Sequence, residues 1–511
     1  MAAADPAAIL KRLCFKSPVP GDCLESFGMT SNRSKEAPRT GSGSACVVGA
    51  GPNGLAAAIV LAQAGLSAEV YEAQSQPGGG ARTMELTLSG FLHDFGSAVH
   101  PLAIGSPFFS TLPLVEYGLQ WIHSPAPLAH PLDDGTAVML ERNLQDASCA
   151  LGVDGVAWQR WIEPFVTRWS ALTEDALRPV SLLPAHPFLM ARFGLSAFRS
   201  ATSLANATFR SDRTKALFAG IAAHSVLSLD EPFSAAAGLL LGAAAHAVGW
   251  PIPKGGAQSI SQALCTVLAN FGVRVRTSEP VESLDALPTY DLTLCDLTPR
   301  QLSRIAGSRL SEGFRRRMEK YRYGPGVFKV DYALSSAIPW KAADCLLAAT
   351  VHVGGNMQEI AESEYAMSHE KLAEKPFVLV TQPSLFDSSR APAGKHTAWA
   401  YCHVPNGSRV DMLERIEDQI ERFAPGFRDC ILARRVFRPA DLEAMDANLV
   451  GGDIAGGASD MRQMLFRPTW RQYATSARDI YLCSSSTPPG GGVHGMCGFN
   501  AANLALSRLG K

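Results

Sequence analysis

The pattern of apolar and polar positions over residues 44–73 predicts a strand, then a helix, then a second strand. This stretch reads SACVVGAGPNGLAAAIVLAQAGLSAEVYEA. It holds a short apolar run, a glycine-rich turn, an alanine-rich stretch with helical spacing and a second apolar run. This order predicts half of a βαβ mononucleotide-binding unit.

The pattern divides the rest of the chain into further segments. The first stretch is rich in Ala, Ser, Pro and Gly and lacks an apolar period, which indicates a disordered leader. Helical patterns, a repeated turn, helix and strand unit, a run of strands, and a final strand, glycine loop and helix follow. The predicted parts are 1–43 (leader), 44–130 (first binding segment), 131–250 (helical substrate or cap region), 251–300 (second binding segment), 301–455 (substrate domain) and 456–511 (third binding segment).

Composition narrows the class of protein. The chain has 511 residues, of which 47% are hydrophobic and 18% charged, so it can bury a large core. Its formal net charge is -1 and no basic stripe interleaves with aromatic residues, so no nucleic acid partner is expected. The 11 cysteines show no CxxC pairs, which argues against a disulfide framework and against a structural metal site.

The sequence gives only weak signals for the cellular location of the protein and for contact with a membrane. Lys11, Arg12 and Lys16 suit an organellar transit peptide, but nearby acidic residues dilute that pattern. Both the cytoplasm and an organellar matrix, in a mitochondrion or a plastid, therefore stay open. The apolar stretch Phe233 to Val248 is shorter than the ~20 residues that span a bilayer, so it predicts a buried helix.

The glycine turn carries the strongest chemical signal. Gly49, Gly51 and Gly54 form GxGxxG directly after the apolar run, where they permit a tight turn, close approach to a pyrophosphate and close packing of helix on strand. The helix that follows offers its free N–H groups to phosphate. Glu72 ends the second strand, where its carboxylate can accept hydrogen bonds from a ribose diol. Together these features predict a dinucleotide site.

A second glycine turn favours FAD over NAD. Residues 77–82 read PGGGAR, and Gly79 and Gly80 allow the backbone to pass close to the pyrophosphate. Arg82 is predicted to pair with phosphate or to face the flavin, with a surface ion pair as the alternative. In the GFLHDFGSAVHP stretch that follows, Asp94 and Gly96 suit a turn beneath the isoalloxazine ring. Asp94 and His100 equally suit capping or packing roles.

The glycine-rich loop near the end of the chain is the third motif. PPGGGVHGMCG, residues 488–498, includes Gly492 and Val493 and precedes a predicted helix. The start of a helix suits the flavin N1 and C2 carbonyl, where negative charge develops on reduction. Cys483 and Cys497 lie nearby, and a covalent flavin link through one of them is an alternative; we expect buried, inert thiols and a noncovalent flavin.

With these motifs in view, the chain resembles the phytoene desaturase-like branch of the flavin amine oxidase superfamily, including members described as pyridine nucleotide-disulfide oxidoreductase domain proteins. The resemblance covers about residues 45–506 and rests on VVGAGPNGLAAA with Glu72, PGGGART, WPIPKGGAQSISQAL and YLCSSSTPPGGGVHGMCGFNAA. It implies an α/β fold in which a Rossmann-like FAD-binding domain, assembled from three segments, interleaves with an α+β substrate domain.

The resemblance also implies roles for single residues. It assigns the adenine contact to the backbone of Val281, and it assigns the N–H facing the flavin to Met496. Lys254, Gly255 and Gly256 resemble the turn that opens the second binding segment. Two departures stand out: Ser484 to Ser486 replace the Gly-Asp that many FAD enzymes carry, and the link 279–298 is short for the hairpin common in these folds.

The resulting functional prediction is hydride transfer between a substrate C–H and flavin N5 of FAD, or a redox-neutral isomerisation. The expected substrate is an apolar, lipid-like or polyene small molecule. His494 and His100 are the candidate acid/base residues, because histidine titrates near neutrality. An amine oxidase, a prenyl-binding protein of the GDP-dissociation-inhibitor type and a noncatalytic flavoprotein remain alternatives. No membrane span is expected, peripheral membrane contact stays open, and the sequence does not indicate an oligomeric state.

Overall fold

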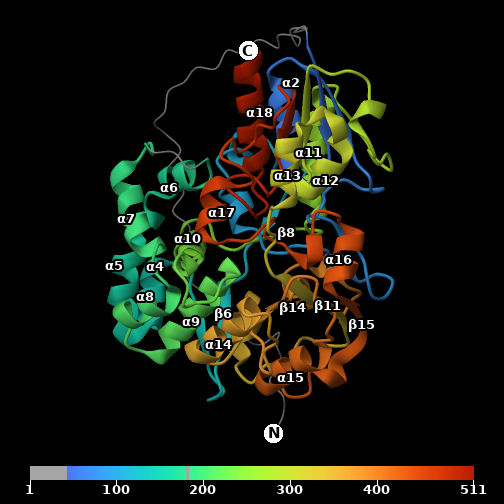
Figure 1. Cartoon of the computed structure of the whole chain (residues 1–511). Coiled ribbons are helices and arrows are strands. Elements are labelled where there is room, and N and C mark those ends of the chain that lie inside the picture. Colours follow the sequence, from blue (N-terminus) through green and yellow to red (C-terminus); the bar gives the residue numbers. More distant parts are fainter. Residues whose placement is uncertain (1–42, 180–182, 511) are drawn as a thin grey trace. The chain divides into compact units, whose positions relative to one another are not determined.

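In the computed structural model, which describes residues 43–179 and 183–510, a parallel sheet of five strands forms the dinucleotide-binding half (Figure 1). Its strand order is β16-β10-β1-β2-β9, and every neighbouring pair is parallel. The strands are β1 (Ser44–Val48), β2 (Ser67–Tyr71), β9 (Arg274–Arg276), β10 (Leu292–Cys295) and β16 (Ile480–Leu482).

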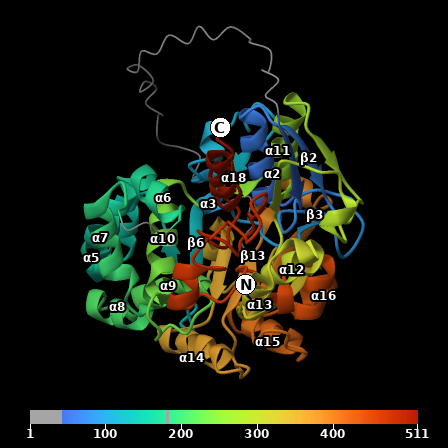
Figure 2. The same ribbon diagram turned by 45° about the horizontal axis from the view of Figure 1, so that its top comes forward.

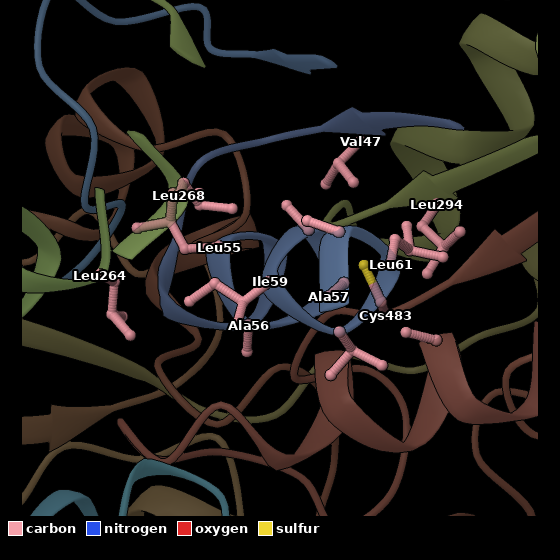
Figure 3. Close-up of a cluster of buried hydrophobic side chains, with 14 of the residues drawn as sticks. Val47, Leu55, Ala56, Ala57, Ile59, Leu61, Leu264, Leu268, Leu294 and Cys483 are labelled. Carbon is pink, nitrogen blue, oxygen red and sulfur yellow. The ribbon is translucent and has the colours of Figure 1, made fainter. Parts of the chain in front are cut away.

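Helices cover both faces of this sheet. One face carries α2 (Pro52–Gln63), α11 (Gln258–Asn270) and α18 (Met496–Leu509), and the other carries α12 (Pro299–Ala306) and α13 (Glu312–Glu319). Figure 3 shows α2 surrounded by apolar side chains, among them Val47, Leu264 and Leu294 from neighbouring elements. Because α2 is buried on all sides, its alanine-rich sequence suits close packing of helix on strand and helix on helix.

A second sheet of seven strands forms the other half. Its order is β15-β11-β14-β13-β12-β6-β7, antiparallel except for the pair β12 and β6. The strands are β6 (Ala126–Pro131), β7 (Ala137–Leu140), β11 (Gly326–Leu334), β12 (Ala348–Val353), β13 (Val378–Thr381), β14 (His396–Val404) and β15 (Ile431–Phe437). Two small antiparallel sheets pair β3 (Thr83–Glu85) with β4 (Leu92–Asp94) and β5 (Trp121–Ile122) with β8 (Ile252–Pro253).

The remaining helices surround the second sheet. Figures 1 and 2 show α5 to α9 together on one side of the molecule, with α14 and α15 beside the sheet. Their bounds are α3 (Pro101–Ile104), α4 (Leu144–Ala150), α5 (Gly155–Val166), α6 (Trp169–Ala176), α7 (Pro187–Ala197), α8 (Ala201–Thr208), α9 (Asp212–Ala222), α10 (Ser234–Ala247), α14 (Met357–Ser368), α15 (Leu413–Phe423), α16 (Pro439–Met445) and α17 (Met461–Phe466).

The predicted fold class is confirmed. The parallel sheet takes strands from three separated parts of the chain, and the mixed sheet with its helices lies between them in sequence. The stretch predicted as a buried helix is α10, and within the described ranges no helix is long and apolar enough to span a membrane. The predicted leader lies, except for Gly43, outside the described residues.

Candidate dinucleotide site

The predicted glycine turn lies at the switch point of the parallel sheet. From β1 the chain first runs outward to β2 and β9 and then returns to β10 on the other side of β1. In open α/β sheets ligands bind outside the carboxyl ends of the strands at this point. Gly49 follows β1 with φ +101°, Gly51 caps α2, and Gly54 packs against the Gly49 carbonyl. The three glycines therefore sit where their predicted roles require.

Asp296, at the carboxyl end of β10, was not predicted as a site residue. Its carboxylate accepts a hydrogen bond from the Gly54 N–H over 2.9 Å. A Cβ added to Gly51 would lie 2.7 Å from Asp296 Oδ2, so the carboxylate adjoins the glycine that a pyrophosphate approaches. Burial raises the pKa of Asp296 to about 7. The sequence signal was an acid directly after a buried strand.

The second glycine turn lies against the first. The Gly78 N–H donates to the Ala50 carbonyl over 2.8 Å, and a Cβ on Gly79 would lie 3.3 Å from Gly51 Cα. A Cβ on Gly80 would meet no atom within 4 Å. The two turns thus converge from distant positions, and Gly80 keeps open space beside them.

Glu72 is bound to the glycine turn itself. One carboxylate oxygen accepts from the Ala50 N–H over 2.7 Å and the other from the Gln74 N–H over 2.9 Å. Burial raises the pKa of Glu72, and the nearby Asp446 adds to that rise. The Glu279 N–H donates to the Glu72 carbonyl, which brings the segment with Val281 beside this strand end, where Val281 packs partly buried in the cluster that contains Tyr71.

Arg82 is buried between the two halves of the molecule. Its Nε donates to the Gly79 carbonyl over 2.7 Å and its Nη2 to the Met445 carbonyl over 2.9 Å, while the guanidinium lies over the Phe95 ring. Arg82 is only 3% exposed, so it does not form the surface ion pair that was the alternative. The arginine fixes the second glycine turn and leaves positive charge near Glu72.

The C-terminal glycine loop reaches the same end of the sheet. Helix α18 packs along α2, with Gly498 against the Asn53 carbonyl and Gly495 beside Ala56, while Gly492 lies beside His494 and Leu102. Val493 packs against the core around α2. The Met496 N–H, which the resemblance assigns to the flavin, donates here to His494 Nδ1 over 3.0 Å.

Both candidate acid/base histidines are buried and neutral near pH 7. Burial lowers the pKa of His494 to about 4 and that of His100 to about 4. The Nε2 atom of each ring has no hydrogen-bond partner within the described part of the chain. Ser106 Oγ donates to the His494 carbonyl, so the segment that begins at His100 adjoins the C-terminal loop. The acid/base prediction for His494 and His100 assumed that histidine titrates near neutrality, and burial removes that property from both rings.

The two cysteines beside the loop are enclosed thiols. Cys483 and Cys497 are fully buried. Burial raises the pKa of Cys497 to about 12 and that of Cys483 well above its usual range. A protonated, buried thiol is a poor nucleophile, which fits a noncovalent cofactor.

A buried charged junction joins the dinucleotide half to the second sheet. Lys329 on β11 pairs with Asp331, and Asp331 Oδ1 lies 3.6 Å from His93 Nδ1 on β4. Next to it, Arg390 pairs with Asp94 over 2.6 Å, and the Ala257 N–H donates to Asp94 over 2.8 Å. Asp94 therefore acts as a structural link between three segments. Lys329 and Asp331 were not predicted, although two charges spaced by two within the apolar run GVFKVDYAL were a visible signal.

The residues at the switch point fit FAD. Open space beside Gly80 and close approach at Gly51 provide the cradle for a diphosphate. Asn53 Oδ1, buried at the start of α2, has no partner among the residues that the structure describes. Two buried carboxylates are poor matches, Asp296 beside Gly51 and Asp446, whose Oδ2 would lie 3.6 Å from a Cβ on Gly79, because ionised carboxylates repel a diphosphate.

Comparisons with known proteins agree with this geometry. A family model described as an NAD(P)-binding Rossmann-like domain matches residues 47–112. The chain is 25% identical to mouse pyridine nucleotide-disulfide oxidoreductase domain-containing protein 2, over 91% of this chain and 93% of that protein. It is also 25% identical to a lycopene-forming phytoene desaturase of Paracoccus, over 89% and 95% of the two chains.

A solved structure of putrescine oxidase shares the fold with a TM-score of 0.58 at 16% identity, covering 92% of this chain and 99% of that one. Together the comparisons confirm the predicted resemblance to the phytoene desaturase-like proteins and the class of enzyme, a flavin-dependent oxidoreductase.

Proposed function

We propose that the chain binds FAD noncovalently and transfers hydride between a C–H bond of an apolar substrate and flavin N5. The observation that carries this proposal is the meeting of two glycine turns at the switch point, with Gly79 against Gly51 and open space at Gly80. A single glycine turn would suit many dinucleotides, whereas the second turn offers backbone to the far side of a diphosphate. Bound FAD would supply the hydride acceptor.

The residues of the chain bind and orient the cofactor. The positive dipole end of α2 would attract the diphosphate, although Pro52 has no N–H and the Gly54 N–H already donates to Asp296. Glu72 retains acceptor capacity for a ribose diol beside its two backbone hydrogen bonds. The start of α18, a helix of 14 residues, offers its positive end near the C-terminal loop. That end of the helix would stabilise negative charge on a reduced flavin.

His494 holds its proton at a defined atom instead of exchanging it near pH 7. Because His494 Nδ1 accepts from the Met496 N–H, the proton of the neutral ring resides on Nε2. His494 therefore fixes the loop in front of α18. We propose that it orients the loop and that proton exchange with the substrate, where the reaction needs it, involves another group.

The apolar character of the substrate is inferred from two sources. The phytoene desaturase relative acts, by its name, on a polyene. The second sheet also turns an aromatic surface toward the dinucleotide half, with Phe437 against Phe95 at 6.0 Å and Trp399 stacked on Tyr401 at 5.5 Å. Lys329 Nζ lies 5.1 Å from the Trp399 ring centre, so this aromatic pair already holds a cation. That occupancy favours a neutral substrate over an amine.

Gly80→Ala tests the cofactor site with little disturbance of the fold. The added methyl group meets no atom within 4 Å in the protein, and Gly80 does not have a positive φ. We expect FAD affinity to fall by about tenfold or more, because inserting a methyl group into an occupied space costs about 1–3 kcal/mol. Gly313→Ala, also free of contacts within 4 Å, is the matched control. Equal FAD affinity in both variants would contradict the proposed site.

A further inference from the structure

The two faces of the second sheet differ in chemistry. One face packs against α15 and is almost entirely apolar, as in Val330, Val351 and Val380. The opposite face turns toward the helices and the dinucleotide half, and it carries polar side chains in two rows across the strands. Strand registers define the first row as Thr350, Thr381, Trp399 and Asp331, and the second as His352, Leu379, Tyr401 and Lys329.

The first row is a line of buried polar atoms without partners. Thr350 Oγ1, Thr381 Oγ1, Trp399 Nε1 and Asp331 Oδ1 make no hydrogen bond with any part of the described chain. These residues are at most 5% exposed. They occupy neighbouring positions on four adjacent strands, which spans about 14 Å at ~4.8 Å per strand.

The second row combines internal contacts with one unpartnered atom among the described residues, His352 Nδ1. His352 Nε2 lies 3.0 Å from His224 Nε2, and Lys329 pairs with Asp331. Each buried polar group left alone costs about 1–3 kcal/mol. Buried polar atoms are nearly always paired, and this row sets four unpartnered ones at neighbouring positions on adjacent strands. The first row therefore offers hydrogen-bonding atoms to a partner from outside the chain.

The donors and charges of the row define what it can bind. Trp399 Nε1 only donates, each threonine hydroxyl donates or accepts, and Asp331 Oδ1 accepts. Lys329 and Asp331 already neutralise each other, so a substrate ammonium or carboxylate buried beside them would lack a counter-charge, and both charged groups are disfavoured. A neutral oxygen accepts from tryptophan and threonine, and a hydroxyl also donates to Asp331.

We propose that this row binds a neutral oxygen function, a carbonyl or a hydroxyl, carried by an otherwise apolar substrate. The inference rests on the proposed function and narrows its substrate class from a hydrocarbon to an oxygen-bearing lipid-like molecule. The Asp331 end of the row adjoins His93 on β4, so the oxygen is held next to the dinucleotide half of the molecule.

Binding of matched probes to the FAD-loaded protein tests the proposal. Dodecane, 1-dodecanol, 2-dodecanone, dodecylamine and laurate share one chain length, and calorimetry or the flavin spectrum reports their binding. We expect the alcohol or the ketone to bind at least ~tenfold more tightly than dodecane, as two or more hydrogen bonds allow. The amine and the carboxylate are expected to bind no better than dodecane.

The double variant Thr350→Val and Thr381→Val is expected to reduce the preference for oxygen to less than about threefold. Tyr332→Phe is the matched control, because it removes another unpartnered buried hydroxyl, from the opposite face of the same sheet. It is expected to keep the wild-type preference. Equal binding of dodecane and dodecanol by the wild type, or an unchanged preference in the double variant, would overturn the proposal.

A stability measurement separates a binding row from a structural one. Without ligand, the valine variants are expected to keep or raise the urea midpoint of unfolding, since each removes an unsatisfied hydroxyl. A lower midpoint would show that the hydroxyls have structural partners and would also overturn the proposal. A protein that does not take up FAD at all would instead count against the proposed function.

Discussion

The Gly54 N–H donates to Asp296 Oδ2 over 2.9 Å, across 242 residues of sequence. This hydrogen bond ties the first glycine turn to the end of β10 and places a buried carboxylate beside the expected diphosphate. Since burial raises its pKa from 3.8 to about 7, the protonation of Asp296 changes within the physiological range. The cofactor site therefore carries a negative charge at high pH that it lacks at low pH.

FAD affinity is expected to fall as the pH rises from 6 to 8. Protonated Asp296 still accepts from Gly54, whereas the ionised form repels the diphosphate. Asp296→Asn keeps the acceptor without the charge, so its affinity is expected to be higher at pH 8 and nearly independent of pH. Asp291→Asn, at the opposite end of the same strands, is the control. The same slope in wild type and Asp296→Asn, measured by FAD titration, would exclude this role.

Asp296 also affects stability. Because its folded pKa exceeds the unfolded value of 3.8, the unfolded chain releases this proton first as the pH rises. Its contribution therefore lowers the free energy of unfolding between about pH 4 and pH 7, and the penalty is constant above that range. Asp296→Asn is expected to be more stable than the wild type at pH 8 and to lose that advantage near pH 4. Urea titrations at both pH values measure the difference.

The buried histidines change the free energy of unfolding with pH in the opposite direction to Asp296. Burial lowers the pKa of six of them from 6.5 to about 3 or about 4, and that of His352 well below its usual range; the set is His93, His100, His130, His224, His246, His352 and His494. Below pH 6.5 the unfolded chain takes up protons that the folded chain does not. We expect the free energy of unfolding to fall steeply from pH 6.5 to pH 4.

His494→Asn tests one member of this set, since the asparagine oxygen can still accept from the Met496 N–H. The variant is expected to show a shallower acid slope in urea unfolding, by about one proton, and an unchanged pH profile of flavin reduction between pH 6 and pH 8. His186→Gln changes an exposed histidine and serves as the control. If the rate of flavin reduction changed with pH near neutrality in the wild type and in His186→Gln but not in His494→Asn, the acid/base role predicted from the sequence would be supported.

The pair Lys329 and Asp331 is expected to behave as a buried ion pair. Lys329→Met leaves an uncompensated carboxylate in the junction and is expected to destabilise the protein by about 3–5 kcal/mol. The double variant Lys329→Met and Asp331→Leu removes both charges and is expected to recover most of that loss. Urea unfolding of Lys329→Met, of Asp331→Leu and of the double variant measures the coupling energy between the two side chains. Additive effects of the two substitutions would show that the pair does not act as a unit.

The local parts of the site could be predicted from the sequence, because one strand, one turn and one helix carry them. The GxGxxG turn and Glu72 lie within 24 residues of each other, so the glycine spacing and the apolar periodicity of this short stretch predict their geometry. Asp296 and the polar row depend on pairing between strands far apart in sequence, and register is not visible in composition. The lowered histidine pKa values depend on burial by several segments, which explains why a neutral-pH role was expected for His494 and His100.

The visible spectrum of the purified chain, before and after unfolding in denaturant, tests the central claim most directly. A bound flavin absorbs near ~450 nm and carries the chemistry that the fold positions. We expect a yellow protein whose colour separates from the unfolded chain, because Cys483 and Cys497 are buried, protonated thiols. Colour that stays on the unfolded chain would contradict the noncovalent site. A folded, colourless protein that cannot be reconstituted with FAD would contradict both FAD binding and the oxidoreductase function.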